Sequence, residues 1–160
     1  KINGDEKFID YLLADLQASN IVYKKNEKWI IKGVEITLDD DDKILSNQLL
    51  TILNKEGFVT SNLEDLSINN NCSQERTKKI LNVLENNSEV VRVNETLIFS
   101  MQNMNDLKEH LDVFFRSNEV LSMKDFKEIA DTTRKYAVPL LEYFDKIKYT
   151  FRVEDGRKLF

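Results

Sequence analysis

The feature that most constrains the fold is a pattern repeated three times, in which a helix is followed by two short strands joined by a turn. The three copies start near Phe8, Lys79 and Pro139. A helix followed by a short hairpin is the second half of a winged helix, and repeats of this length indicate one small domain per copy. The sequence therefore predicts tandem winged-helix domains, mostly α with small β-hairpins (α+β). Aligning the hairpins places three basic residues in register, 68 and 60 residues apart: Lys24, Arg92 and Arg152.

The repeat also predicts the domain boundaries. Residues 1–38 form the third helix and hairpin of a winged helix, and residues 39–45 form an acidic connector. Residues 46–100 form a complete winged helix, and residues 101–160 form a C-terminal one. The first residue is not methionine and lies inside a repeat, so we expect the chain to be part of a longer protein. We also expect residues 34–38 to tie the incomplete first unit to a neighbour.

Local signals place the elements of the middle unit. Its first helix is predicted from Ser46 to Glu56, followed by a short strand at residues 58–60. Ser61 and Glu64 fit a capping box, in which each side chain bonds the backbone N–H of the other residue. The four aspartates at residues 39–42 are interpreted as a solvated connector or as the start of a helix.

The last unit has the same plan. Helices are predicted over residues 106–116 and 124–130, and Ser122 with Asp125 repeats the capping signal. Thr132 and Thr133 are candidate caps of the third helix, because their hydroxyl groups can accept backbone N–H bonds.

Pro139 lies inside the predicted third helix of the last unit. Proline removes one backbone hydrogen bond and clashes with the carbonyl four residues earlier, here that of Lys135. We favour a bent helix from Thr133 over the alternative, in which the regular helix begins only near Pro139.

Charge is distributed unevenly along the chain. The formal net charge is −5, and residues 101–160 carry 11 Lys and Arg against 11 Asp and Glu. In the last unit, Arg134 and Lys135 stand at the start of the third helix, where the middle unit has Gln74 and Glu75. A basic helix start together with a basic hairpin indicates contact with a phosphate backbone. The hairpin of the last unit supplies its own basic residues: Arg152, Arg157 and Lys158.

The run TTRKYAVPLLEYFDK, followed by a hairpin of the form xRVxDxRxL, resembles the C-terminal winged helix of the bacterial selenocysteine-specific elongation factor. The resemblance is close over about the last thirty residues. Three positions depart from the pattern: Lys148 replaces a common glycine, Phe151 a usual arginine, and Glu154 a usual glycine.

The resemblance implies a function and partners. The family's domain binds the SECIS hairpin of selenoprotein mRNA, which recodes UGA, and the longer protein brings selenocysteyl-tRNA to the ribosome. GTP and Mg²⁺ are expected only in the missing GTPase domains, because no GxxxxGK[ST] motif occurs in this chain. We therefore expect a cytoplasmic monomer with no cofactor of its own. The RNA contacts are predicted at six residues: Thr133, Arg134, Lys135, Arg152, Arg157 and Lys158.

Two other functions remain open from the residues alone. One is a DNA-binding regulator with tandem winged helices, and the other is a protein-interaction module whose basic residues are incidental. An enzyme is disfavoured, because Cys72 and His110 have no catalytic or metal-ligating partners nearby in sequence. No apolar run is long enough to cross a membrane, and a single cysteine fits a reducing compartment.

Overall fold

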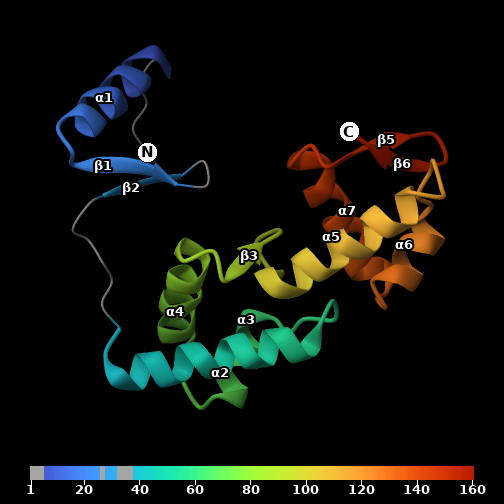
Figure 1. The fold of residues 1–160 in the computed structure, drawn as a ribbon. Helices are drawn as coiled ribbons and strands as arrows, with labels where there is room; N and C mark the ends of the chain where they lie inside the picture. Colours follow the sequence, from blue (N-terminus) through green and yellow to red (C-terminus); the bar gives the residue numbers. More distant parts are fainter. Residues whose placement is uncertain (1–5, 26–27, 32–37) are drawn as a thin grey trace. The chain divides into compact units, whose positions relative to one another are not determined.

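The computed structural model describes residues 6–25, 28–31 and 38–160. The chain divides into two compact units, Lys1–Thr37 and Leu38–Phe160. In the described residues every strand belongs to a two-stranded antiparallel hairpin, and helices make up most of the rest (Figure 1). The predicted class, mostly α with small hairpins, is therefore confirmed. No helix among these residues is both long and apolar enough to span a bilayer.

The first unit contains α1 (Glu6–Ala18) and a hairpin of β1 (Val22–Lys25) and β2 (Lys28–Ile31). Val22 pairs with Ile31, and Val22 is buried. The predicted helix and hairpin are both present. The predicted tie over residues 34–38 lies outside the described residues except for Leu38, which packs against the core of the middle winged helix.

The middle winged helix consists of α2 (Asp40–Glu56), α3 (Leu63–Asn69), α4 (Gln74–Asn86), β3 (Val90–Arg92) and β4 (Ile98–Ser100). Apolar residues three and four positions apart on α2 and α4 face each other and build its core. The buried members of this core are Leu45, Leu49, Leu53, Leu66, Ile80, Leu81, Leu84, Val90 and Ile98.

The structure corrects the predicted connector at residues 39–45 and the helix start at Ser46. The side chain of Asp39 accepts a hydrogen bond of 2.7 Å from the backbone N–H of Asp42, so α2 begins at Asp40. Three aspartates then occupy the first turn, where the helix dipole favours negative charge. The acidic run is thus the start of a helix.

Two further predictions for the middle unit are wrong. The N-cap of α3 is Asn62 instead of Ser61, and its side chain accepts the N–H of Asp65. Ser61 donates instead to the carboxylate of Glu56. Residues 58–60 form no strand.

The C-terminal winged helix consists of α5 (Met101–Phe115), α6 (Met123–Ile129), α7 (Arg134–Lys146), β5 (Thr150–Val153) and β6 (Gly156–Leu159). The helix predicted from residue 106 begins five residues earlier, because Ser100 caps it through the N–H of Asn103. The capping box of Ser122 and Asp125 is confirmed. Leu121 pairs with Arg157 and adds one rung to the hairpin. A side chain at Gly156 would place its Cβ 2.2 Å from the carbonyl oxygen of Leu121, so this approach requires glycine.

Helix α7 starts at Arg134 and continues through Pro139. The alternative prediction, in which the regular helix begins only near Pro139, is therefore wrong. Thr133 occupies the N-cap position, but its side chain makes no capping hydrogen bond. Thr132 does not cap either. Its hydroxyl group donates a hydrogen bond of 2.6 Å to the carbonyl oxygen of Phe58 in the middle winged helix.

The repeat is visible in the backbone as well as in the sequence. Each third helix ends in a residue with positive φ before its hairpin, at Asn20, Ser88 and Lys148. These residues keep the separations of 68 and 60 that align the three hairpins. Asn71 and Asp131, in the turns before α4 and α7, are also 60 residues apart and share positive φ. The same turn geometry therefore recurs in each copy.

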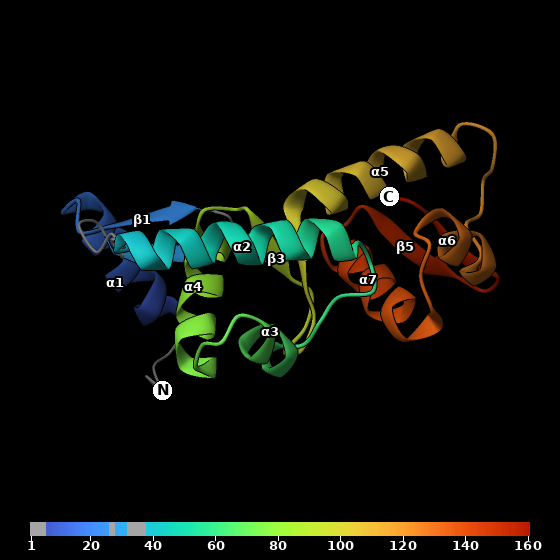
Figure 2. The same ribbon diagram turned by 90° about the horizontal axis from the view of Figure 1, so that it is seen from below.

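One hydrophobic core joins the middle and C-terminal winged helices. Leu97 and Phe99, from the middle hairpin, are buried together with Leu107, Leu111 and other residues of the C-terminal domain. The ring of Phe58 lies 5.8 Å from that of Phe99. Figure 2 shows α5 leaving the end of the middle hairpin and running along the C-terminal domain.

Polar contacts reinforce this junction. The side-chain amide of Asn103 donates hydrogen bonds of 3.1 Å to the carbonyl oxygens of both Leu53 and Asn54 at the end of α2. These bonds hold the start of α5 against the middle winged helix, and the bond from Thr132 to Phe58 holds the turn before α7 against it.

Phe99→Ala should therefore destabilise both winged helices at once. Loss of this fully buried ring is expected to lower the free energy of unfolding by about 3–5 kcal/mol. Amide hydrogen exchange, read separately in peptides from α4 and α7, should accelerate in both. The control Val113→Ala, on the exposed face of α5, should change the stability by less than about 0.5 kcal/mol. Faster exchange in α4 alone would show that the two domains do not share a core.

Candidate nucleic-acid interface

The start of α7 presents two cationic side chains to solvent. Arg134 and Lys135 are exposed, and Arg134 makes no hydrogen bond or ion pair within the described chain. The ammonium group of Lys135 lies 5.1 Å from the centroid of the Tyr136 ring. Tyr136 itself is half-buried against the C-terminal core, as its place on the apolar stripe predicts.

Backbone N–H groups are available at the same place. The first N–H groups of a helix have no intrahelical acceptor, and a capping side chain usually takes one of them. In the middle domain, Ser73 accepts the N–H of Arg76 at 3.2 Å. At the corresponding position, Thr133 leaves its helix uncapped. The start of α7 thus combines uncapped donors with two exposed cations.

The three basic residues of the C-terminal hairpin differ from one another. Arg152 and Arg157 are direct cross-strand partners. Arg152 is exposed, whereas the side chain of Arg157 is 11% exposed and lies 3.4 Å from the carboxylate of Asp145. Arg157 therefore offers little surface to a phosphate. The same carboxylate accepts a hydrogen bond of 2.7 Å from the hydroxyl group of Thr150, so Asp145 holds the hairpin against the end of α7.

Lys158 lies in the next register position, opposite Phe151. Successive side chains of a strand point to opposite faces, so Lys158 and Arg157 face different sides of the hairpin. The ammonium group of Lys158 is paired with the carboxylate of Glu119, which is itself largely exposed. The hydrogen bond from Lys158 holds the pKa of the Glu119 carboxyl group below its ordinary value. This pair lies at the surface, where a competing anion can reach it.

The middle domain pairs its hairpin differently. Arg92, which corresponds to Arg152, lies 3.3 Å from the carboxylate of Glu85, which corresponds to Asp145. In the C-terminal domain the carboxylate has Arg157 as its partner, and no ion pair of Arg152 occurs in the part of the chain that the structure describes. Because Asp145 pairs with Arg157 and not with Arg152, Arg152 is exposed.

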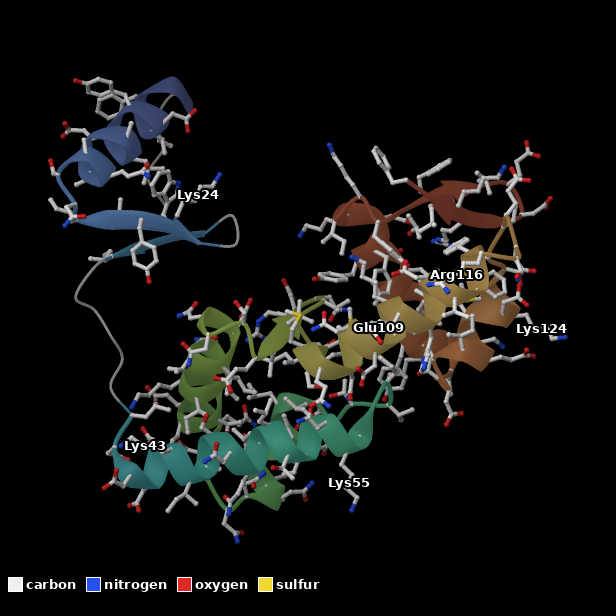
Figure 3. The ribbon with its side chains drawn as sticks, in the orientation of Figure 1. Lys24, Lys43, Lys55, Glu109, Arg116 and Lys124 are labelled. Atoms are coloured by element: carbon white, nitrogen blue, oxygen red, sulfur yellow. The ribbon has the colours of Figure 1, made fainter. Side chains whose placement is uncertain are left out.

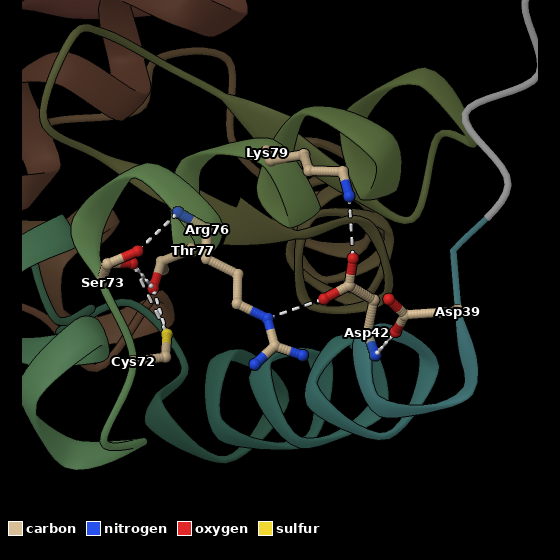
Figure 4. Close-up of polar contacts among 7 residues, drawn as sticks. All are labelled: Asp39, Asp42, Cys72, Ser73, Arg76, Thr77 and Lys79. Atoms are coloured by element: carbon tan, nitrogen blue, oxygen red, sulfur yellow. Dashed lines mark hydrogen bonds and ion pairs between the residues drawn. The ribbon is translucent and has the colours of Figure 1, made fainter.

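Basic residues of α4 are also neutralised in the middle domain, as Figure 4 shows. Asp42, from the first turn of α2, is 3% exposed. Its two carboxylate oxygens lie 2.7 Å from Nε of Arg76 and 2.8 Å from Nζ of Lys79. Hydrogen bonds from Lys79 and Arg76 lower the pKa of the Asp42 carboxyl group. The acidic run thus holds two of the cations that this helix could offer to an anion.

The structure sorts the six predicted site residues into two groups. Thr133, Arg134 and Lys135 are consecutive at the start of α7, and Arg152, Arg157 and Lys158 belong to the hairpin. No hydrogen bond, ion pair or ring contact joins the two groups among the described residues. Sequence reasoning missed Asp145 and Glu119, because a carboxylate 12 or 39 residues from its partner leaves no local signal. The exposed cation Arg116, labelled in Figure 3, directly follows the last residue of α5.

Other candidate chemistry is sparse. Cys72 is half-buried, and its Sγ lies 2.7 Å from the hydroxyl oxygen of Thr77. Among the described residues no group of three or more His, Cys, Asp or Glu side chains is placed to hold a metal ion.

Comparison with known proteins identifies the last domain. Residues 114–159 match the family model described as the winged helix of elongation factor SelB. The C-terminal domain is similar to this SelB winged helix, and we call it the SelB-type domain. A selenocysteine-specific elongation factor from Desulfomicrobium baculatum is 24% identical over 153 residues, which are 96% of this chain. The predicted resemblance is therefore confirmed. The chain spans about a quarter of that relative, because the match covers 24% of its length.

Two solved structures share the fold of the SelB-type domain and its neighbour. A bacterial selenocysteine-specific elongation factor, EF-Sec, matches with a TM-score of 0.59 and 24% identity. The match covers 93% of this chain and 23% of that chain. The mRNA-binding domain of SelB from E. coli, solved in complex with SECIS RNA, matches with a TM-score of 0.62 and 13% identity. Here the match covers 76% of this chain and 98% of that chain.

The ion pairs next to the SelB-type domain lead to a pH prediction. The folded-state pKa of Asp42 is lowered, so its charge stabilises the fold above about pH 4, and this contribution is lost as the pH falls through the folded pKa. Asp42→Asn should lower the urea midpoint at neutral pH, and the difference from the wild type should shrink below about pH 4. The control Asp41→Asn, at an exposed position, should leave the midpoint nearly unchanged. A difference that persists at low pH would mean that Asp42 acts through packing and not through its charge.

Proposed function

We propose that this chain binds the SECIS hairpin of selenoprotein mRNA through its C-terminal winged helix, as part of a selenocysteine-specific elongation factor. The observation that carries this proposal is the SelB match of residues 114–159, which contain all the exposed cations assigned above. The solved neighbour described as an mRNA-binding domain in complex with SECIS RNA supports the same assignment.

The start of α7 supplies the first contact. RNA loops present unpaired bases and crowded phosphates, which proteins bind with charged side chains and backbone donors. Arg134, Lys135 and the uncapped N–H groups beside Thr133 would bind loop phosphates, and Arg134 would also reach a base edge. A guanidinium group suits this role because its donors form a fork that can bond two acceptors at once.

The hairpin supplies the second contact. Arg152 would bind the backbone of the stem directly, since it is exposed. Lys158 would join after an RNA phosphate displaces Glu119. Arg157 would orient the hairpin without touching RNA, because its ion pair with Asp145 holds the hairpin against α7.

The rest of the proposal follows from the family. The chain would act in the cytoplasm as a single copy, without catalysis and without a cofactor of its own. GTP hydrolysis with Mg²⁺, and contacts with selenocysteyl-tRNA and the ribosome, would belong to other parts of the longer protein. The middle winged helix would serve as a support for the C-terminal one, because Arg76 and Lys79 of its third helix are paired with Asp42, and Arg92 of its hairpin is paired with Glu85.

The direct test is an affinity measurement with an RNA pool of stem–loops whose loops are randomised. A stem–loop selected from this pool should bind more tightly than duplex RNA with the same stem and than duplex DNA. Arg134→Ala should cost about 1–3 kcal/mol of binding free energy and reduce discrimination between loops. Lys135→Ala should weaken all RNAs alike, and the control Arg116→Ala, at the residue directly after α5, should change little.

Three outcomes would contradict the proposal. Preference for duplex DNA would favour the DNA-binding regulator, and partner binding that resists both salt and nuclease would favour the protein-interaction module. Arg134, Lys135 and Arg152 are the three proposed phosphate contacts that are not already paired with a carboxylate among the described residues. With three such contacts, the slope of log affinity against log salt concentration should be about −2 to −3. A flat salt response would exclude electrostatic binding of RNA.

Glu119 provides a second test, because it competes with RNA for Lys158. Glu119→Gln should raise the affinity for the selected stem–loop by about two- to fivefold, as expected for release of an exposed ion pair. The salt slope should steepen by about 0.7 to 0.9. Both changes should vanish when Lys158→Gln is combined with Glu119→Gln. A gain that survives the double substitution would show that Glu119 only repels RNA from a distance.

A further inference from the structure

An exposed pair of aromatic rings lies on the hairpin of the C-terminal domain. Phe151 in β5 is 41% exposed, and Phe160, directly after β6, is 77% exposed. Their ring centroids are 6.3 Å apart, and the ring planes are almost perpendicular, at 88°. Exposed phenylalanine rings are costly in water, so a pair that packs edge to face outside the core is a candidate binding surface.

The backbone fixes this pair in place. The N–H of Phe160 donates a hydrogen bond of 3.0 Å to the carbonyl oxygen of Tyr149, and Phe151 is held by the β5–β6 ladder. The two rings therefore form a preorganised corner, with the face of one ring against the edge of the other.

Cations border the corner. The ammonium group of Lys148 lies 6.0 Å from the centroid of the Phe160 ring. Lys158, which is paired with Glu119, is the cross-strand partner of Phe151 on the same face of the hairpin. The pair is thus an apolar surface with positive charge at its border, which suits a flat aromatic group that carries a negative charge. A nucleotide has this combination, and protein aromatic rings commonly stack on unpaired bases.

The backbone at Lys148 points to the same conclusion. Its φ is 57°, in the left-handed region that disfavours residues with a side chain. Asn20 and Ser88 occupy the equivalent turns of the other two copies, and both carry short polar side chains. Lys148 is therefore strained at the position from which its ammonium group lies near the Phe160 ring. Backbone strain of this kind is often retained at functional sites.

We propose that Phe151, Phe160 and Lys148 form a second RNA contact, in which an unpaired nucleobase stacks in the aromatic corner and its phosphate pairs with Lys148. This proposal rests on the proposed function. Arg134 stands at the first end of α7, which has 13 residues and is roughly 18 Å long, and the corner begins at Lys148, two residues beyond the other end. It would therefore hold a different nucleotide from the one bound by Arg134.

The test uses the 160-residue chain and the stem–loop selected from the randomised pool. Phe160→Leu and Phe151→Leu should each weaken binding by about five- to tenfold, because stacking on an aromatic ring is lost while the apolar volume is kept. The salt slope should not change, since no charge is removed. The control Ile147→Ala, at the exposed aliphatic residue directly before Lys148, should leave the affinity unchanged within about twofold.

Lys148→Gly gives an independent readout. It removes the strain at positive φ and should raise the Tm. It should also weaken RNA binding and reduce the salt slope by about 0.7 to 0.9, the value of one phosphate contact. A substitution that stabilises the fold and weakens binding cannot act by unfolding the domain.

The outcomes separate the two proposals. If Arg134→Ala weakens binding but the two Phe→Leu variants and Lys148→Gly bind as the wild type does, the aromatic corner is not an RNA contact and the proposed function stands. If the wild-type chain prefers no RNA in the pool, both proposals fail. Photocrosslinking of the 4-thiouridine-substituted stem–loop to peptides containing Phe151 or Phe160 would support the corner directly. Crosslinks confined to the start of α7 would overturn it.

Discussion

The junction between the middle and C-terminal winged helices is the constraint on which the rest of the structure depends. Phe99 belongs to the hairpin of one domain but is buried in the core of the other. Thr132, in the turn that leads into α7, donates its hydrogen bond to Phe58 of the middle domain. The residues proposed to bind RNA begin at the next position along the chain. The middle domain therefore positions the start of α7.

The repeat shows how one fold can carry a charged surface in one copy and hide it in another. Each domain has a carboxylate near the end of its third helix, Glu85 in one and Asp145 in the other. The middle hairpin has one basic residue, Arg92, and the C-terminal hairpin has three: Arg152, Arg157 and Lys158. The middle domain pairs Glu85 with Arg92, which lies toward the turn. The C-terminal domain pairs Asp145 with Arg157 on the returning strand, which leaves Arg152 exposed. The C-terminal hairpin thus differs both in its number of cations and in the one that pairs with the helix carboxylate.

The sequence predicted features that depend on local spacing and failed where distant residues decide. The three hairpins, the capping box of Ser122 and the helix through Pro139 follow from patterns within a few residues. The start of α2 was missed because both Asp39 and Ser46 can cap a helix, and only Leu45 and the burial of Asp42 select the earlier one. In the candidate site, the basic residues were visible in the sequence. Their pairing with Asp145 and Glu119 was not, since it depends on how the hairpin packs.

An acidic chain can still bind an anionic ligand when its carboxylates are paired with nearby cations and lie far from the binding surface. The net charge is −5, yet charges separated by more than about 8 Å are largely screened at physiological ionic strength. At the start of α2, the charge of Asp42 is offset by Arg76 and Lys79, and Asp40 is paired with Lys43. At the start of α7, the first turn contains no acidic residue, and the helix dipole adds to the charge of Arg134 and Lys135. What an approaching phosphate meets is therefore set by the pairing within each domain, far more than by the sum over the chain.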